Sequence, residues 1–355
     1  MKQGTVTRRG YLAGASAGTL GVLAGCVSSA GSSPDTLRVG AREAYVNAVS
    51  TSAGEWVKKQ FEKRHGTTIE WVIKEQGMND FIQRRKEDAP LDADAYVGVT
   101  PSDLVRADRV LTNDIDLFSP LDTIDTGSVV DEYWFDPQRR IVPTGASHVC
   151  IVYNDRKVSE PASFDALLDP EYSDGLLMAN PQTTVTGLDF LLWTIHAKGR
   201  DDYLDYWEQL MKNNVRALKS WNSAYSAYES GEAPMVVSYS TDQIYATNEG
   251  KPLAKHRIGF PNDTGYAYIS GVGKFADTDR GDLVDTFAQF LIESKVQRRT
   301  AVLNVGFPAV EDASLPKKYQ PHVKKPETVI QYSVDELRKH ADRWRSKWAR
   351  QVASK

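Results

Sequence analysis

The sequence predicts an α/β fold with mainly parallel strands. Short apolar runs typical of strands alternate with helix-like segments from residue 37 onward, and the alternation begins again near residue 164. A chain of 355 residues is long enough for two domains of ordinary size. We therefore expect two α/β lobes, each with its own series of strands and helices.

The first series begins after a polar N-terminal segment. A strand over 37–39, a helix over 52–63 and a strand over 68–73 form a strand-helix-strand unit. The elements expected next are a helix over 77–85, a strand over 94–99, a helix that opens over 102–106 with Ser102 as its cap, and extended segments over 141–143 and 148–154.

The second series contains a helix with a strongly apolar face. Over 188–198, Leu188, Leu191, Leu192 and Ile195 lie on one helical face, so this face is expected to pack against a sheet. The other expected elements are segments over 164–168 and 176–179, helices over 203–212 and 223–230, strands over 234–239 and 267–272, an amphipathic helix over 283–294, and a closing helix over 334–352.

The first 26 residues are typical of an export signal. Arg8 and Arg9 form a twin-arginine pattern, followed by a small-residue apolar stretch over 12–24. The run Leu23-Ala24-Gly25-Cys26 resembles a lipobox, whose cysteine is lipid-modified, and 27–36 is then a flexible tether. A retained transmembrane helix is the alternative, but the apolar run is shorter than the ~20 residues of a span. We expect a lipid-anchored protein on the outer face of the cytoplasmic membrane, at the cell surface or in the periplasm.

Composition and motifs argue against several functional classes. A net charge of -4 gives no case for nucleic-acid binding. With Cys26 assigned to the lipid, Cys150 is a single thiol in an apolar run, which excludes an intramolecular disulfide. The run over 14–18 matches a serine-nucleophile pattern, but it lies in the export signal, where no sheet can present the serine. The sequence contains no metal-spaced histidine pair and no phosphate-loop lysine motif. We expect a protein that is not an enzyme and that needs no metal or cofactor.

A hydroxyl-rich turn over 180–187 opens the apolar helix. Its Thr183, Thr184 and Gly187 surround unpaired helical amides and a partial positive charge, a combination that holds anions. A threonine-capped core helix without a ligand explains the local pattern about equally well. The turn alone leaves both interpretations open.

Aromatic residues follow this turn. Trp221 and Tyr225 lie one helical turn apart, and Tyr239 and Tyr245 come after them. Such side chains can clamp a flat heterocycle, and a permanent cation over an aromatic face gains roughly 0.5 to 2 kcal/mol. Ordinary core packing is the alternative, and it is strongest for Tyr225. Trp221 and Tyr239 have polar neighbours and are better candidates for ligand contact.

Together these segments resemble thiamine-binding solute receptors, within the iron/thiamine/polyamine-type cluster of extracellular solute-binding proteins of ABC transporters. The resemblance runs from about residue 37 to the closing helix and is strongest over 180–245. Further matching segments are Ala93-Asp94-Ala95-Tyr96-Val97-Gly98, Ile151-Val152-Tyr153-Asn154, Asn304-Val305-Gly306-Phe307-Pro308, and the pair Trp344 and Trp348. It implies a two-lobed periplasmic-binding-protein fold of type II with a hinge, where 37–143 and about 268–355 form lobe 1 and 144–267 form lobe 2.

The resemblance also implies a function and a site. A monomeric receptor would capture thiamine or a thiamine phosphate by closure of the lobes and deliver it to the permease subunits of an ABC importer. The turn residues match positions near the phosphate or hydroxyethyl end of the ligand. The four aromatic residues match positions around its pyrimidine and thiazolium rings.

Several positions depart from the family pattern. Relatives carry Tyr-Asp where this chain has Arg42 and Glu43, and Asp-Gly where it has Gln76 and Gly77. If Arg42 faces the cleft, it would favour a phosphate-bearing ligand, and Glu43 would partly restore the missing carboxylate. A solvated strand end is the alternative for both. His148 is a further possible cleft residue, although a histidine at a domain crossing is more often structural.

Two alternative functions follow from these departures. The first is a receptor of the same fold for another small phosphorylated or anionic solute. The second is an anchored extracellular enzyme acting on a thiamine-like molecule, for which Cys150 is the only candidate thiol.

Overall fold

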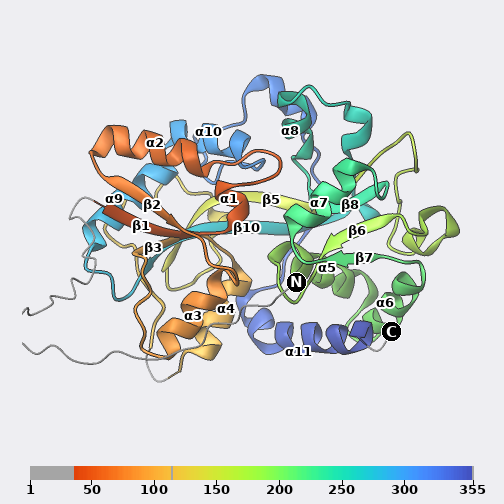
Figure 1. The fold of residues 1–355 in the computed structure, drawn as a ribbon, viewed down its shortest axis with the longest axis horizontal. Helices are drawn as coiled ribbons and strands as arrows, with labels where there is room; N and C mark the ends of the chain where they lie inside the picture. The colour runs from red at the N-terminus through yellow and green to blue at the C-terminus, as the bar shows by residue number, and fades with distance from the viewer. Residues whose placement is uncertain (1–35, 113–114, 354–355) are drawn as a thin grey trace, which may run out of the picture. The chain divides into compact units, whose positions relative to one another are not determined.

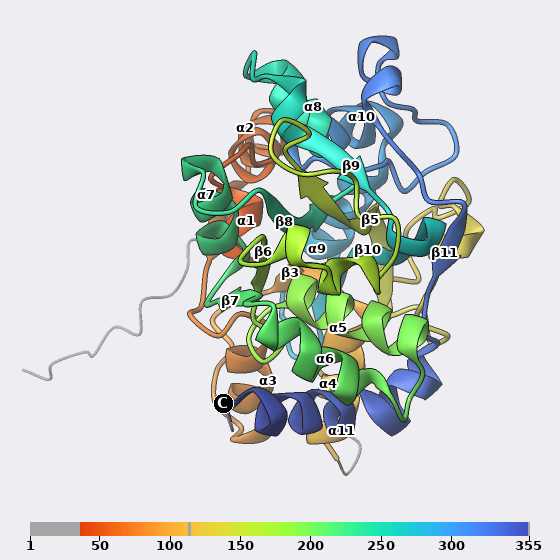
Figure 2. The same cartoon turned by 90° about the vertical axis from the view of Figure 1, so that its right-hand side faces the viewer.

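The computed structural model describes residues 36–112 and 115–353, drawn as coloured ribbons in Figures 1 and 2. The twin-arginine signal, the lipidation of Cys26 and most of the tether lie outside these residues. None of the helices in the described stretches combines the length and hydrophobicity needed to cross a bilayer.

Strands and helices alternate along the chain, as the sequence predicts. The strands are β1 Thr36–Ala41, β2 Thr68–Val72, β3 Ala95–Val99, β4 Phe118–Ser119, β5 Ile141–Tyr153, β6 Leu176–Ala179, β7 Arg216–Leu218, β8 Met235–Tyr239, β9 Arg257–Gly259, β10 Thr264–Phe275 and β11 Thr328–Ile330. The α-helices are α1 Glu43–Val46, α2 Gly54–His65, α3 Met78–Lys86, α4 Pro101–Val110, α5 Val185–Lys198, α6 Tyr203–Lys212, α7 Trp221–Ser230, α8 Asp242–Asn248, α9 Gly281–Ile292, α10 Ser294–Leu303 and α11 Val334–Ala353.

The strands form one continuous sheet in the order β2-β1-β3-β10-β5-β8-β6-β7. At one end β1 pairs in parallel with β2 and β3, and at the other β6 pairs in parallel with β7 and β8. In the centre, β10 runs antiparallel to β3 and β5, and β5 runs antiparallel to β8. The expected predominance of parallel strands therefore holds only toward the two ends, because two long central strands carry the chain between the two halves of the sheet.

These central strands are longer than the extended segments expected from the sequence. β5 spans 13 residues and includes both extended segments expected over 141–143 and 148–154. Its register with β10 shifts between Ser270 and Gly271, and that of β10 with β3 shifts between Gly271 and Val272. A Cβ atom at Gly271 would lie 2.4 Å from the carbonyl oxygen of Val142, so only glycine allows this close approach.

Some helix boundaries differ from the expected ones because local caps determine them. Thr100, not Ser102, caps α4: its hydroxyl accepts a hydrogen bond from the Asp103 amide, and the Asp103 carboxylate accepts one from the Thr100 amide. Pro101 then occupies the first helical position, which suits its fixed φ. The short helices α1 and α8 were not expected, since neither is long enough to show helical periodicity.

The apolar helix α5 is enclosed on all sides. Its residues 186–195 are all buried, so it contributes more than the single apolar face expected from the sequence. One core cluster joins α5, the β5–β8 part of the sheet and the two tryptophans of α11, Trp344 and Trp348. α11 lies along α4 and α6 and so connects elements from both halves of the sheet (Figures 1 and 2).

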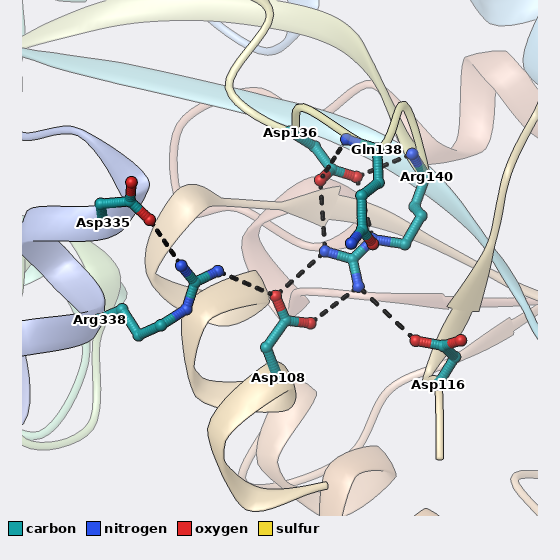
Figure 3. Close-up of polar contacts among 7 residues, drawn as sticks. All are labelled: Asp108, Asp116, Asp136, Gln138, Arg140, Asp335 and Arg338. Atoms are coloured by element: carbon teal, nitrogen blue, oxygen red, sulfur yellow. Dashed lines mark hydrogen bonds and ion pairs between the residues drawn. The ribbon is translucent and has the colours of Figure 1, made fainter. Parts of the chain in front are cut away.

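An ion-pair network centred on the buried Arg140 holds α4 against the start of β5 and against α11 (Figure 3). The Arg140 side chain is 8% exposed, and its guanidinium donates to both oxygens of Asp108, at 2.8 and 3.1 Å, and to Asp136 at 3.2 Å. Asp108 also lies 3.5 Å from Arg338 of α11. A bidentate guanidinium pair of this kind fixes orientation as well as distance, so the position of α4 is well defined.

Candidate functional site

A cavity of about 850 Å³ lies between the two halves of the sheet. Its size is typical of small-molecule sites. Most residues proposed as ligand contacts from the sequence line it, and they come from the β1–α1 junction, the β2–α3 loop, the start of α5, α7, β8 and α8. These lining residues are Arg42, Glu43, Gln76, Gly77, Thr183, Thr184, Trp221, Tyr239 and Tyr245.

One wall of the cavity is aromatic. The Trp221 ring lies 6.4 Å from the Tyr239 ring, and Tyr239 lies 5.0 Å from Tyr268 of β10. The Trp221 indole donates to the Ser238 hydroxyl at 3.3 Å, and the Tyr239 hydroxyl lies 2.6 Å from the Thr186 hydroxyl. These polar contacts fix the rings, so the wall presents a preformed π surface.

Tyr225 stands behind this wall and does not line the cavity. Its ring stacks on Trp221 at 4.8 Å between centroids and is fully buried. Its hydroxyl donates to Asp242 at 2.5 Å, and Asp242 also lies 2.6 Å from Nδ1 of His256. Burial and the Asp242 charge raise the pKa of Tyr225 well above its usual range, so the phenol stays a neutral donor. Tyr225 is therefore a core residue that packs behind Trp221, as the alternative interpretation of the sequence expected.

The turn before α5 both caps the helix and lines the cavity, so it fits both interpretations that the sequence left open. The Thr184 hydroxyl accepts from the Gly187 amide at 3.1 Å and donates to the Asn180 carbonyl at 2.9 Å, so it caps the helix. Thr183 and Thr184 also line the cavity. Gly187 does not, because it packs so closely that a Cβ atom would lie 2.2 Å from the Ala179 carbonyl oxygen.

Arg42 lines the cavity, but its charge is already engaged. Its guanidinium pairs with Asp103 and lies 3.4 Å from the Gly98 carbonyl. Burial alone would lower its pKa, but the Asp103 carboxylate outweighs this effect and raises the pKa above the usual arginine value. The neighbouring Glu43 lines the same part of the cavity. Arg42 is therefore a neutralised part of the wall rather than a free cation.

Two further candidates lie away from the cavity lining. His148 packs 5.7 Å from the Phe307 ring, and burial together with the Lys325 charge lowers its pKa to about 4. Cys150 is fully buried in β5, and burial raises the pKa of its thiol well above normal, which opposes formation of a thiolate. Within the two described stretches, no group of His, Cys, Asp or Glu side chains is positioned to hold a metal ion.

Several lining residues were not predicted from the sequence, namely Arg106, Arg109, Tyr268, Asp242 and Arg345. A local signal exists only for Arg106 and Arg109, which are spaced i, i+3 on one helix. Tyr268 and Arg345 reach the cavity through long-range packing. Asp242 supplies a buried carboxylate behind the aromatic wall, where it accepts a hydrogen bond from the Tyr225 hydroxyl.

Comparison with known proteins agrees with this geometry. The family model described as bacterial extracellular solute-binding protein matches residues 56–327. The thiamine-binding periplasmic protein of Escherichia coli (strain K12) is 25% identical over 307 residues, which cover 86% of this chain and 90% of that protein.

Solved structures share the fold. A periplasmic thiamin binding protein superposes with a TM-score of 0.79 at 24% identity, covering 89% of this chain and 96% of that chain. A ferric binding protein from Campylobacter jejuni reaches 0.70 at 16% identity, covering 89% and 99%. These findings confirm the type II periplasmic-binding-protein fold and the resemblance to thiamine-binding receptors.

Proposed function

Because the chain belongs to the bacterial extracellular solute-binding protein family, we propose that it captures thiamine or a thiamine phosphate for an ABC importer. The observation that carries this proposal is the aromatic wall of Trp221, Tyr239 and Tyr268 along a cavity large enough for such a ligand. The names of the relatives support the same ligand class.

The chemistry of the wall suits a thiazolium cation. A cation over an aromatic face gains roughly 0.5 to 2 kcal/mol, and more as water is excluded. Asp242 lines the same cavity and accepts a hydrogen bond from the Tyr225 hydroxyl behind the wall, so it adds a carboxylate near the proposed site of the cation. The hydroxyls of Thr183 and Thr184 at the start of α5 suit the hydroxyethyl or phosphate end of the same molecule.

Closure of the two halves is the proposed mechanism. Ligand contacts from both sides of the cavity would stabilise the closed state, and the β5–β10 crossing would act as the hinge. The closed monomer would then present its outer surface to the permease subunits. Lipidation at Cys26 would hold it at the outer face of the cytoplasmic membrane.

A receptor for another small phosphorylated or anionic solute is the second candidate. The observation in its favour is the presence of Arg106, Arg109 and Arg345 along the cavity. The enzyme hypothesis lacks such support, because the thiol of Cys150 is buried and its pKa is raised.

Ligand-induced stabilisation tests the proposal. We would measure the melting temperature of the full chain in mild detergent with thiamine, thiamine monophosphate, thiamine diphosphate and inorganic phosphate. A ligand at ~100 times its dissociation constant adds about 2.7 kcal/mol, which is a shift of several degrees. We expect a shift with at least one thiamine form and its loss in Trp221→Ala.

Trp134→Ala is the matched control. Trp134 is a half-buried tryptophan outside the cavity lining, so this variant should melt earlier but keep the ligand-induced shift. The absence of any shift in the unaltered protein with every thiamine form would rule out thiamine as the ligand. A shift with inorganic phosphate alone would favour the second candidate.

A further inference from the structure

Three arginines gather at one end of the cavity. Arg106 and Arg109 extend from α4 and Arg345 from α11, and all three line the cavity. Asp342 pairs with Arg109 and, at 2.9 Å, with Arg345. Arg106 has no hydrogen-bond or ion-pair partner among the described residues, and its Nε is shielded from solvent.

Within the described residues, carboxylates balance the charges of this arginine cluster only in part. Arg109 and Arg345 share the single carboxylate of Asp342, while the neighbouring Asp103 is paired with Arg42. Burial, reinforced by the charges of Arg106 and Arg109, lowers the pKa of Arg345 to about 10. Burial lowers the pKa of Arg106 as well, and the Asp103 charge opposes this effect without outweighing it. Holding like charges together at a partly buried site is unfavourable, and an anion with several negative charges would relieve the repulsion.

The cluster adjoins the turn that opens α5. The Gln182 side chain donates to the backbone carbonyl of Arg345 at 2.9 Å, which links the turn directly to α11. The Arg140 network holds α4, and with it Arg106 and Arg109, in a defined position (Figure 3). The arginine cluster and the threonine hydroxyls thus belong to one continuous end of the cavity.

We propose that the arginine cluster is a subsite for a second phosphate, so that the cavity takes the diphosphate ester of the ligand whose ring contacts the aromatic wall. This inference rests on the proposed function. Guanidinium groups bind phosphate oxygens through paired, charge-assisted hydrogen bonds, and Arg106 lines the cavity without a hydrogen-bond partner among the described residues. The start of α5 would hold the first phosphate, and Arg106 with Arg345 the terminal one.

Isothermal titration calorimetry of the full chain in mild detergent tests the subsite. Thiamine, thiamine monophosphate, thiamine diphosphate and inorganic pyrophosphate would be titrated into the unaltered protein, Arg106→Gln, Arg106→Lys and Arg345→Gln. We expect the diphosphate to bind at least tenfold more tightly than the monophosphate. Arg106→Gln and Arg345→Gln should each reduce this ratio about tenfold and leave the affinity for thiamine unchanged. Arg106→Lys should retain part of the preference for the diphosphate over the monophosphate, because lysine keeps the positive charge but lacks the planar guanidinium group.

Arg343→Gln is the control, since it removes an exposed arginine of the same helix that does not line the cavity and lies outside the Arg140 network. It should leave the ratio as it is in the unaltered protein. If thiamine binds and the ratio is the same in Arg106→Gln, Arg345→Gln and the unaltered protein, the subsite is overturned while the proposed function stands. If no thiamine form binds but pyrophosphate binds in an Arg106-dependent manner, the proposed function fails and the anion subsite survives. Variants with unchanged melting temperatures ensure that altered ratios report on binding.

Discussion

At the residue scale, the neighbours of a charged group determine what it can do. Arg42 is the arginine that the sequence analysis singled out for phosphate, yet Asp103 neutralises it. Arg106, three residues farther along the same helix as Asp103, makes no hydrogen bond or ion pair among the described residues, and the Asp103 charge does not prevent burial from lowering its pKa. Tyr225 similarly changes from an expected ligand contact to a support for Trp221, because Asp242 holds its hydroxyl in the core.

Acid sensitivity is a prediction that belongs to one residue, His148. Burial lowers its pKa from 6.5 to about 4. Between these pH values the unfolded chain binds a proton that the folded chain does not, so stability rises with pH and falls on acidification. We expect a loss of up to about 3 kcal/mol in the free energy of unfolding between pH 6.5 and pH 4 from this group.

Urea titrations at several pH values measure this effect. His148→Gln should flatten the dependence of the unfolding free energy on pH between 4 and 6.5. His196→Gln, which changes an exposed histidine, should keep the original slope. An unchanged slope in His148→Gln would mean that another group is responsible.

At the element scale, the start of α5 serves stability and ligand binding at once. Thr184 caps the helix, and Gly187 allows the helix to approach the end of β6 closely. The same turn leaves the first helical amides without intrahelical partners at the edge of the cavity. The structural and functional interpretations of the turn are therefore compatible.

Substitutions of two neighbouring threonines measure how much the helix cap contributes to stability. Thr184→Ala should lower the free energy of unfolding by about 1 kcal/mol, because the Gly187 amide loses its acceptor. Thr183→Ala removes a hydroxyl that donates to the Lys219 carbonyl at 3.1 Å and caps nothing, so we expect less than about 0.5 kcal/mol. Chemical denaturation measures both values, and equal losses would contradict the assigned cap.

At the scale of the whole described molecule, the two sides of the cavity are joined by the central strands and also touch each other at the cavity rim. Glu75 and Lys219 extend from opposite sides and lie 3.5 Å apart, with both side chains more than four-fifths exposed. The Asn222 side chain reaches the backbone of Asn47 and Val49 across the same rim. Exposed contacts of this kind contribute little free energy, so ligand contacts would have to hold the halves together.

Spin labels on cysteines placed at Glu75 and Lys219 should report this closure. We expect a broad distance distribution without ligand, and a shorter, narrower one when thiamine or its phosphates are added. The buried Cys150 should not be labelled. A label pair at Glu55 and Lys63 within α2 should not change. If the distance distribution between the labels at the rim stays the same when a ligand is bound, this result would argue against closure.

The sequence by itself determined the α/β class, most helices and strands, the capped turn before α5 and the aromatic residues near the cavity. Local periodicity, capping and spacing carry that information, because each depends on residues only a few positions apart. Only the tertiary structure decided that the central strands are antiparallel, that Arg42 is neutralised and that Arg106, Arg109 and Arg345 converge. Strand direction and charge balance depend on groups far apart in the chain: Arg345 lies more than two hundred residues after Arg109, and folding alone brings them together.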